Sequence, residues 1–568
     1  MSSGRYLRKS SISAIVVVAA ACSLTSGGAE SPVDETPQNI VSPDLSLDVT
    51  AELDPENSLR AEVTFENETG SDAVVEVLDQ SGQGWRVLPP AAGPGSQSVP
   101  LLGLRPSTTY TVTVTLDDLS GTGSFNTGPL PDDMPPIEVS QAGEGMAEGL
   151  TLFDVIPLSL GEPSGPTEDG YLIAVDGDGD VVWYYRQTHS IQDVRRTDSG
   201  NLLFVHHETG VRMLDVLDNA LVEWSGTTGL DMAPEDGHGR PYAGEDAIRV
   251  DTDQMHHEVI EAPNGNLITL SRELAVVDGF SEPVCDGEEE FEGSYEVVTD
   301  TIVEFDSETG DVVNEWSLFD MVDPLDTLEK VRPSEFCSQY LADVYPAFAA
   351  KDWTHANAVV LDVERNALLV SVRHLDQIYA IRYQDDDEGP AGELIWRLGE
   401  GGDFTLLEGE WFLHQHAPEV LDDGSIMVYD NGNERPGTSL EDPDELPYSR
   451  AVQYVIDESS MTARQVWENR LDSPGDAVYA PFVGDADLLD NGTVLITHGG
   501  LLDPPAHTPF AEGVMVWARI VEVDYGTGNV LFDLTVKDPN GEANWIVYRA
   551  ERIPTMYPDG YAIEPIDG

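Results

Sequence analysis

Two histidines stand at the start of one predicted β-hairpin, in the stretch "WFLHQHAPEVLDDGSIMVYDNGN" that runs from Trp411 to Asn433. Apolar residues flank the tight turn signal Asp-Asp-Gly, which predicts one strand, a turn and a second strand. His416 lies eight residues before the turn glycine, Gly424. An imidazole can serve as a nucleophile, a proton carrier or a metal ligand. A lone histidine in a strand is usually structural, so its meaning depends on what other hairpins carry there.

Other predicted hairpins carry polar residues at the same position. His257 lies eight residues before Gly265, and the longer hairpin "WTHANAVVLDVERN" holds His355 and Asn357 in the corresponding region. The return strand of a hairpin is antiparallel and comes back to the same end. These return strands end in His206-His207, Ser271-Arg272, Arg373-His374, Asp430-Asn431 and Thr497-His498.

Titratable side chains are therefore expected to converge on one spot, with His416, His257, His355, Arg373 and Asn357 as the candidate site residues. Two neighbouring histidines leave the register open. His256 precedes His257 and His414 precedes His416, so the sequence does not decide which member of each pair faces the site.

Such a group suits the transfer of an anionic group. Closely spaced imidazoles disfavour each other's protonation, so some stay neutral and nucleophilic at pH 7. Arginine and amide donors would stabilise charge that develops on a transferring anion. The sequence has no phosphate-binding glycine loop of the Walker type, so we expect neither a nucleotide donor nor another cofactor. Three imidazoles and a water would also make a zinc site, so a metal-dependent hydrolase remains an alternative, although we predict no metal.

The elements that would position these residues repeat along the chain. A turn followed by an apolar strand recurs in "DSGNLLFV", "PNGNLITL", "ERNALLVS", "DDGSIMVY", "DNGTVLIT" and, more weakly, "YPDGYAI" at Gly560. A strand with an aromatic residue recurs in "DVVWYY", "LVEWSG", "VVNEWS", "ELIWRL", "RQVWEN" and "NVLFDL". Such repeats predict an all-β protein whose residues 139–568 form a six-bladed β-propeller. The order of the repeats predicts that both chain ends build one blade, which removes an open sheet edge.

A smaller domain precedes the propeller. Segments such as "LRAEVTFENE" and "DAVVEVLDQ" alternate apolar and polar residues, as half-buried strands do. The segment "LLGLRPSTTYTVTVTL" resembles the late strands of a fibronectin type III sandwich, with Tyr110 near the corner. We therefore expect a small β-sandwich over residues 43–130, joined to the propeller by a Pro-rich linker.

The N-terminus predicts export. Basic residues precede the apolar run "ISAIVVVAAAC", which is too short to span a bilayer and is typical of a signal peptide over residues 1–22. Cys22 follows two alanines, as in a bacterial lipoprotein cleavage site, so we expect lipid modification there, with ordinary secretion as the alternative. Residues 23–42 are a flexible tether by composition. The protein is expected in the periplasm or at the cell surface, held to a membrane only by this anchor.

The net charge excludes some classes of partner, and the remaining cysteines predict a disulfide. The chain has 28 basic and 105 acidic residues, a net charge of −77, which argues against nucleic acid or an anionic membrane surface as a partner. Two cysteines remain beyond Cys22. In an exported protein, Cys285 and Cys337 are expected to form a disulfide that closes a long insertion.

Several of these segments together resemble the bacterial arylsulfate sulfotransferases. They are "MHHEVIEAPNGNLITL", "DWTHANAVVLDVERNALLVSVRHLDQIYAI", "QHAPEVLDDGSIMVYDNGN", "SRAVQYVIDESSMTARQVWE", "GDADLLDNGTVLIT" and "YRAERIP", in this order. The resemblance implies sulfuryl transfer from an aryl sulfate to a phenol, without a nucleotide donor and through a sulfated histidine. It implies a six-bladed propeller with an added N-terminal sandwich, and small aryl sulfates and phenols as partners.

The resemblance also implies roles for the candidate residues. His416, in the pair Gln415-His416, would be the nucleophile, while Arg373 and Asn357 would bind sulfate oxygens. His257 and His355 also fall on the family's sulfate-binding motifs, and acid–base chemistry would have one of them carry the phenolic proton. A sulfatase that transfers to water, a metal hydrolase and a non-catalytic surface lipoprotein remain the alternatives.

Overall fold

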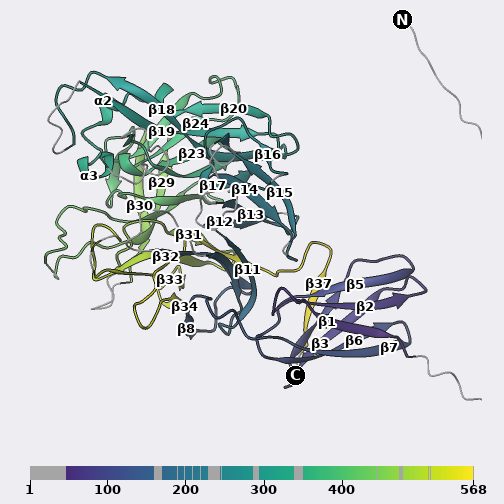
Figure 1. The fold of residues 1–568 in the computed structure, drawn as a ribbon. Helices are drawn as coiled ribbons and strands as arrows, with labels where there is room; N and C mark the ends of the chain where they lie inside the picture. Colours follow the sequence, from purple (N-terminus) through teal and green to yellow (C-terminus); the bar gives the residue numbers. More distant parts are fainter. Residues whose placement is uncertain are drawn as a thin grey trace, which may run out of the picture. The chain divides into compact units, whose positions relative to one another are not determined.

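The computed structural model describes residues 46–158, 169–188, 190–197, 199–206, 209–217, 219–227, 243–244, 246–285, 293–337, 350–442, 444–471, 478–509, 511 and 513–566. Within these ranges the protein is all-β, with antiparallel sheets and a few short helical turns (Figure 1). Those turns are η1 (Leu318–Asp320), α2 (Pro324–Thr327), α3 (Pro333–Phe336) and η3 (Arg373–Leu375). None of the described helices is long and apolar enough to cross a membrane. The predicted signal peptide, Cys22 and the tether lie outside the described residues.

The N-terminal part consists of two sheets that share one apolar core. Val63, Val75 and Val112 come from both sheets and are fully buried in this core, because alternate residues of each strand point inward. One sheet has the order β1-β2-β5, and the other has the order β37-β4-β3-β6-β7. The strands are β1 (Val49–Leu53), β2 (Ala61–Asn67), β3 (Ala73–Asp79), β4 (Gly84–Leu88), β5 (Gly95–Leu101), β6 (Thr109–Leu116), β7 (Leu119–Asn126) and β37 (Ala562–Ile566).

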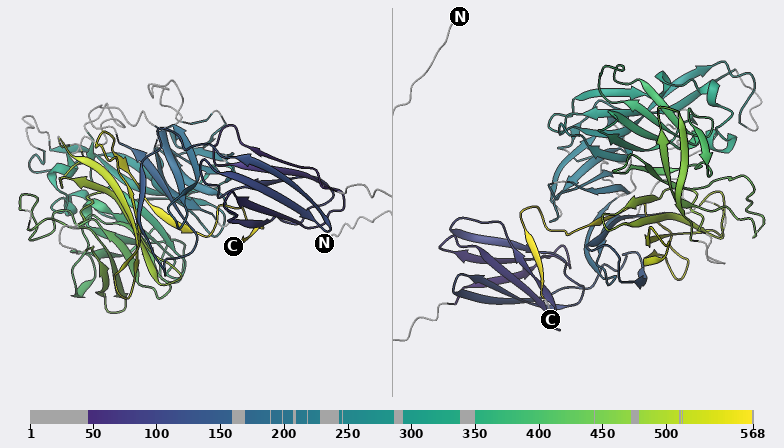
Figure 2. Two further views of the ribbon diagram at one scale, coloured as in Figure 1. Left: turned by 90° about the horizontal axis from the view of Figure 1, so that it is seen from below. Right: turned by 180° about the vertical axis from the view of Figure 1, so that it is seen from behind.

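The segment after Gly560 differs from its prediction. We expected "YPDGYAI" to turn into the second strand of a sixth hairpin. The strand that follows Gly560 is β37, and it pairs with β4 of the N-terminal part (Figure 2). The second-strand position is already taken by β9 (Leu150–Pro157), which pairs with β36 (Ala550–Ile553), so the chain end has no free edge in that sheet.

Six further sheets each contain four consecutive antiparallel strands in the described part of the chain. From the first to the fourth strand they are β36, β9, β10 (Asp169–Val175) and β11 (Val181–Thr188); β12 (Ile191–Arg196), β13 (Leu202–His206), β14 (Gly210–Leu214) and β15 (Ala220–Ser225); β17 (His256–Glu261), β18 (Leu267–Asp278), β19 (Ser294–Phe305) and β20 (Val312–Ser317); β22 (Ala356–Asp362), β23 (Ala367–Val372), β24 (Gln377–Arg382) and β25 (Leu394–Gly399); β27 (His416–Val420), β28 (Ile426–Asp430), β29 (Arg450–Asp457) and β30 (Thr462–Asn469); and β31 (Asp485–Leu488), β32 (Thr493–Asp503), β33 (Met515–Asp524) and β34 (Val530–Val536).

Short strands extend several of these sheets. They are β35 (Trp545–Ile546) on β9, β16 (Ile248–Arg249) on β15, β21 (Lys351–Asp352) on β19, β26 (Thr405–Glu408) on β30 and β8 (Ile137–Ala142) on β34. The predicted repeat is confirmed for five hairpins, whose turns join the first and second strands. The sheet that contains β36 and β9 is built from both ends of the chain, as predicted.

The aromatic strands are the fourth strands of the six sheets, and three of their tryptophans hydrogen-bond to a neighbouring sheet. The indole Nε1 of Trp183 on β11 donates to the carbonyl of Val216, in the turn before β15. Trp224 on β15 donates in the same way to Ser307, before β20, and Trp467 on β30 donates to Tyr525, before β34. A buried indole needs such a partner, so these three tryptophans each link one sheet to the next.

The first strands of the six sheets contact one another in succession. β36 contacts β12, β12 contacts β17, β17 contacts β22, β22 contacts β27, and β27 contacts β31. The succession returns to β36 through β32. The residues that begin these strands therefore lie near one another although the sequence separates them widely.

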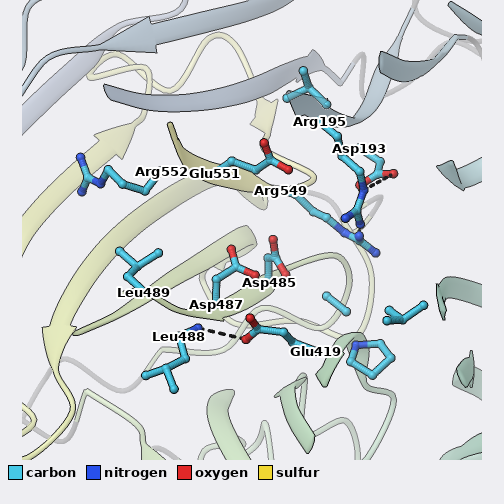
Figure 3. A pocket seen from close by; sticks show the side chains of 14 residues that line it. Asp193, Arg195, Glu419, Asp485, Asp487, Leu488, Leu489, Arg549, Glu551 and Arg552 are labelled. Carbon is cyan, nitrogen blue, oxygen red and sulfur yellow. Dashed lines mark hydrogen bonds and ion pairs between the residues drawn. The ribbon is translucent and has the colours of Figure 1, made fainter. Parts of the chain in front are cut away.

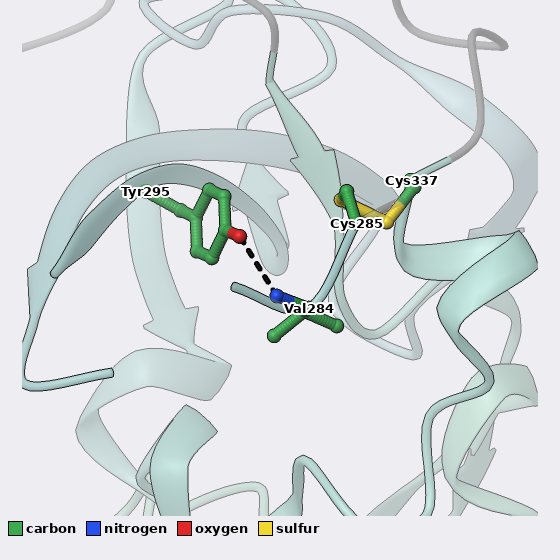
Figure 4. Close-up of a disulfide and its surroundings, with 4 residues drawn as sticks. All are labelled: Val284, Cys285, Tyr295 and Cys337. Carbon is green, nitrogen blue, oxygen red and sulfur yellow. Dashed lines mark hydrogen bonds between the residues drawn. A yellow bond between two sulfur atoms is a disulfide. The ribbon is translucent and has the colours of Figure 1, made fainter. Parts of the chain in front are cut away.

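An insertion after β18 is closed by a disulfide. Cys285 and Cys337 are bonded, with an S–S distance of 2.01 Å, which confirms the predicted pair (Figure 4). Cys337 directly follows α3, which carries Glu335. The bridge thus anchors α3, and the carboxylate of Glu335 reaches the candidate site described below.

Candidate active site

Three first strands begin with irregular backbone that brings their histidines inward. The pairing registers of β17, β22 and β27 each shift within the first residues. A non-glycine residue with positive φ lies at each place: His257 at 63°, His355 at 47° and Ala417 at 46°. A bulge re-aims the side chains beside it, and such strained conformations concentrate at functional sites.

The structure brings the five predicted site residues together. The rings of His257 and His355 meet edge to face, with centroids 5.4 Å apart. His355 and Arg373 are near enough to His416 for each to lower its pKa, and His416 in turn lowers that of His257. Asn357 donates from its side-chain nitrogen to the carbonyl of Gln415, the residue before His416, at 2.8 Å.

In each histidine pair, one member meets the other candidate residues and its neighbour contacts carboxylates. His414 contacts the carboxylates of Glu335 and Asp376, at 2.7 Å and 2.8 Å. His256 is turned toward Asp300, with Nε2 3.3 Å from Oδ1. His256 also touches His257, with their Nδ1 atoms 2.6 Å apart. His257 and His416 are therefore the members that meet the other candidates.

Asn431 fixes the orientation and tautomer of His416. The Nδ1 atom of His416 lies 2.7 Å from the side-chain oxygen of Asn431. The side-chain nitrogen of Asn431 donates to the carbonyls of Ala480 and Val483, at 2.7 Å and 2.8 Å. Because carbonyls only accept, the amide cannot be flipped, and its oxygen must accept from His416. His416 therefore carries its proton on Nδ1, and the lone pair of a neutral ring lies on Nε2.

The Nε2 atom of His416 has no hydrogen-bond partner among the residues that the structure describes, although His416 is only 3% exposed. Burial lowers the pKa of His416 well below its ordinary value, and the charge of Arg373 lowers it further. Burial also lowers the pKa of His257, with a further contribution from His256. Both rings are therefore neutral at pH 7, as the clustering of imidazoles predicts.

A carboxylate supports His355. Nδ1 of His355 lies 2.6 Å from Asp352 Oδ2, and the ring stacks on His374 with centroids 4.7 Å apart. Burial lowers the pKa of His374 to about 4, although Asp352 opposes this shift. Within the described ranges, Asp352, His355 and His374 place their ligand atoms within 4.8 Å of one another and could hold a metal ion. This group contains only one of the three histidines that the metal alternative requires.

Arg373 is held at the edge of the group by the disulfide-closed insertion. It follows β23 directly and donates to the carbonyl of Pro481 at 3.1 Å and to Glu335 of α3 at 3.5 Å. Its side chain keeps 11% exposure. The positive charge is thus fixed beside His416 but still accessible to a small anion.

Three supporting residues received no role from the sequence. Asn431 ends the return strand opposite His416, so its position was a usable signal. Asp352 precedes His355 by three residues, but irregular backbone between them hides their contact. Glu335 had no local signal, because its contacts depend on how the insertion folds back.

Comparison with known proteins gives one matching family and two curated relatives. The model of the family described as arylsulfotransferase (ASST) matches residues 137–549. The arylsulfate sulfotransferase AssT of Lelliottia amnigena is 23% identical over 338 residues, 52% of each chain. That of Escherichia coli O6:H1 is 24% identical over 221 residues, 35% of each chain. The chain thus spans about half the length, or less, of the curated relatives it matches.

Solved structures with a similar arrangement are distant. The periplasmic gluconolactonase PpgL of Pseudomonas aeruginosa is 13% identical, with a TM-score of 0.32, and covers 70% of this chain and 100% of its own. A putative 6-phosphogluconolactonase of Bacteroides uniformis is 10% identical, with a TM-score of 0.30, and covers 84% of this chain and 100% of its own.

Proposed function

Because this chain belongs to the arylsulfotransferase family, we propose that it transfers a sulfuryl group from an aryl sulfate to a phenol through a covalent intermediate on His416. One observation carries the proposal. The hydrogen bond from His416 to Asn431 places the lone pair on Nε2, which faces no described partner, on a residue that is only 3% exposed. A nucleophile needs such a neutral, oriented nitrogen.

In the first half-reaction, Nε2 of His416 attacks sulfur and the bond from sulfur to the aryl oxygen breaks. The electron pair of that bond leaves on the aryl oxygen, which takes a proton and departs as a phenol. In the second half-reaction, the acceptor phenol gives up its proton and its oxygen attacks sulfur. The nitrogen–sulfur bond then breaks, and its electron pair returns to Nε2.

His355 is the better of the two proposed proton carriers. Its Nδ1 donates to Asp352 at 2.6 Å, and such a carboxylate stabilises the imidazolium that a proton donor must first become. Among the described residues, His257 contacts no carboxylate directly: its Nδ1 lies 2.6 Å from Nδ1 of His256. Burial lowers the pKa of His257, and His256 lowers it further. We therefore assign proton transfer to His355, and to His257 a neutral contact with the sulfuryl oxygens.

Arg373 and Asn357 would stabilise the charge on the sulfuryl oxygens. Arg373 is the strongest charge acting on His416. The side-chain nitrogen of Asn357 has two hydrogens and gives one to Gln415, so the other can bind an anion. Losing one such donor typically costs about 10²–10³-fold in kcat.

We also propose the domain organisation that the sequence predicts, a propeller preceded by a sandwich. The six sheets would form a closed six-bladed propeller within residues 139–568, and the two N-terminal sheets would form the fibronectin-III-like sandwich. Support comes from the contacts that run from β36 through β31 and β32 back to β36. Export, lipid modification at Cys22 and a periplasmic or surface location complete the proposal.

A chromogenic aryl sulfate tests this function. We expect the release of its coloured phenol to require a second phenol and to yield the sulfate ester of that acceptor in equal amount. Treatment with a chelator should leave the rate unchanged. Release that is independent of the acceptor would support a sulfatase, and loss of activity on chelation that added Zn²⁺ restores would support the metal hydrolase. Neither alternative draws support from the family.

A further inference from the structure

A second group of titratable residues lines a cavity of about 300 Å³ among the first strands of the sheets (Figure 3). It includes residues that follow the candidate site along these strands. Glu419 comes three residues after His416 on β27, Asp485 and Asp487 lie on β31, and Glu551 lies on β36. Nothing in the proposed transfer uses this cavity.

The arginines around the cavity are already engaged. Arg549 binds Asp193 at 3.0 Å and Glu258 at 2.6 Å. Arg195 contacts the same two carboxylates. Arg552 binds Glu522, outside the lining, at 2.6 Å. These pairs leave four lining carboxylates, Glu419, Asp485, Asp487 and Glu551, without an ion pair among the described residues.

Two of these four also lack other side-chain partners. Asp485 is only 6% exposed, and its carboxylate accepts just the amide of the adjacent Ala486 in the described chain. Asp487 receives no hydrogen bond there. Figure 3 shows both near the middle of the cavity, with Glu419 on one side of them and Glu551 on the other. Glu419 accepts the amide of Leu488 and Glu551 accepts that of Arg196.

Asp485 is buried and Asp487 half-buried. The charges of Arg549 and Arg195 act on Asp485, but neither arginine forms an ion pair with it in the described chain. Burying a carboxylate without a direct partner is costly, so its orientation toward a cavity calls for a ligand.

We propose that this cavity binds a hard divalent cation, Ca²⁺ in the first place, through Glu419, Asp485, Asp487 and Glu551. Four carboxylates supply up to eight oxygens, and Ca²⁺ takes about six to eight oxygen ligands in flexible geometry. Mg²⁺ demands a smaller, stricter octahedron and gives up its waters reluctantly. The lining has no histidine or cysteine, the ligands that Zn²⁺ prefers.

The protonation behaviour of the group agrees with this geometry. Burial raises the pKa of Asp485 to about 6, and it raises those of Glu419 and Glu551 to about 7. Near pH 7, Glu419 and Glu551 are therefore partly protonated when no cation is bound. A bound cation would replace the protons and relieve the repulsion among the carboxylates.

The test uses the purified chain after treatment with EDTA and buffer exchange. CaCl₂ is titrated by calorimetry, and the melting temperature is measured with and without CaCl₂ or MgCl₂. The variant Asp485→Asn/Asp487→Asn removes two proposed ligands. Asp118→Asn/Asp387→Asn removes two exposed charges outside the cavity lining and controls for the general attraction of cations to an acidic surface.

We expect one saturable Ca²⁺ site, a melting temperature that rises with Ca²⁺, and a smaller response to Mg²⁺. The cavity variant should bind Ca²⁺ at least about tenfold more weakly, while its metal-free melting temperature equals or exceeds that of the wild type because repulsion is removed. The control variant should behave as the wild type. The proposal is overturned if the cavity variant keeps wild-type Ca²⁺ affinity, or if Ca²⁺ and Mg²⁺ act equally on all three proteins.

Discussion

His416 and Asn431 are joined by a hydrogen bond of 2.7 Å from ring Nδ1 to the side-chain oxygen, and two backbone carbonyls keep that oxygen facing the ring. His416 begins β27, and Asn431 directly follows β28, the other strand of the same hairpin. A backbone feature thus decides which nitrogen of the ring can attack.

Replacing Asn431 should disturb this tautomer. In Asn431→Ala nothing selects the proton on Nδ1, so we expect kcat to fall by about 10²-fold or more. Asn431→Asp keeps an acceptor for His416 and should retain more activity than Asn431→Ala. Steady-state kinetics on an aryl sulfate with saturating phenol measures both. Equal activity of Asn431→Ala and the wild type would show that the bond does not select the tautomer.

Removing the carboxylate behind His355 should impair proton transfer rather than binding. In Asp352→Asn the imidazolium of His355 loses its partner at 2.6 Å. We expect the loss in kcat/KM to grow with the pKa of the leaving phenol, because poor leaving groups need the proton most. A series of aryl sulfates with graded phenols gives this dependence. A uniform loss across the series would assign Asp352 a purely structural role.

The carboxylate cavity predicts an unusual dependence of stability on pH in the absence of divalent cations. The folded-state pKa values of Asp485, about 6, and of Glu419 and Glu551, about 7, exceed the ordinary value of about 4 in an unfolded chain. The folded protein then binds more protons than the unfolded chain between pH 4 and 7, so these groups lower the free energy of unfolding as pH rises.

This effect is measured as the difference in free energy of unfolding between a variant and the wild type. The difference cancels the contribution of buried histidines such as His374, which act in the opposite direction at low pH. We expect the stability of Asp485→Asn/Asp487→Asn, relative to the wild type, to increase from pH 5 to pH 8. Urea unfolding at both pH values with EDTA present measures it. A difference that stays constant or shrinks with pH contradicts the assigned shifts.

The disulfide should matter for both stability and activity. Cys285 and Cys337 are separated by 52 residues, and a bridge over such a loop typically contributes about 2–4 kcal/mol. The double variant Cys285→Ser/Cys337→Ser should therefore unfold more readily. It should also lose part of its kcat, since α3 places Glu335 3.5 Å from Arg373. Glu335→Gln tests the loss of kcat separately from the loss of stability. Unchanged kcat in both variants would show that the insertion does not contribute to the site.

Much of the fold could be predicted from local patterns. Turn residues such as Gly424 and aromatic residues such as Trp224 each occupy one place in a repeated four-strand unit, so spacing alone located the hairpins. The destination of β37 could not be predicted, because its sequence resembles a second strand and only the prior pairing of β9 with β36 excludes it.

Some of the candidate site could be predicted from the sequence, and some of it could not. His416 and His257 each lie eight residues before a turn glycine, and His355 lies in the corresponding region of a longer hairpin, which the repeat reveals. The choice between His256 and His257 depends on the irregular start of β17, which shifts the register between His256 and Val259. Spacing does not encode such bulges, nor does it encode the contacts of Glu335 across the chain or the convergence of separate strands on the carboxylate cavity.

The most direct test of the account is to trap and locate the intermediate. The wild type is incubated with an aryl sulfate without acceptor, digested at neutral or basic pH to protect the acid-labile adduct, and mapped by mass spectrometry. We predict one sulfuryl group on the peptide that contains His416, its loss on adding a phenol, and neither label nor turnover in folded His416→Ala. A label on His257, His355 or His414, or near-normal turnover by His416→Ala, would contradict the assignment of His416 as the nucleophile.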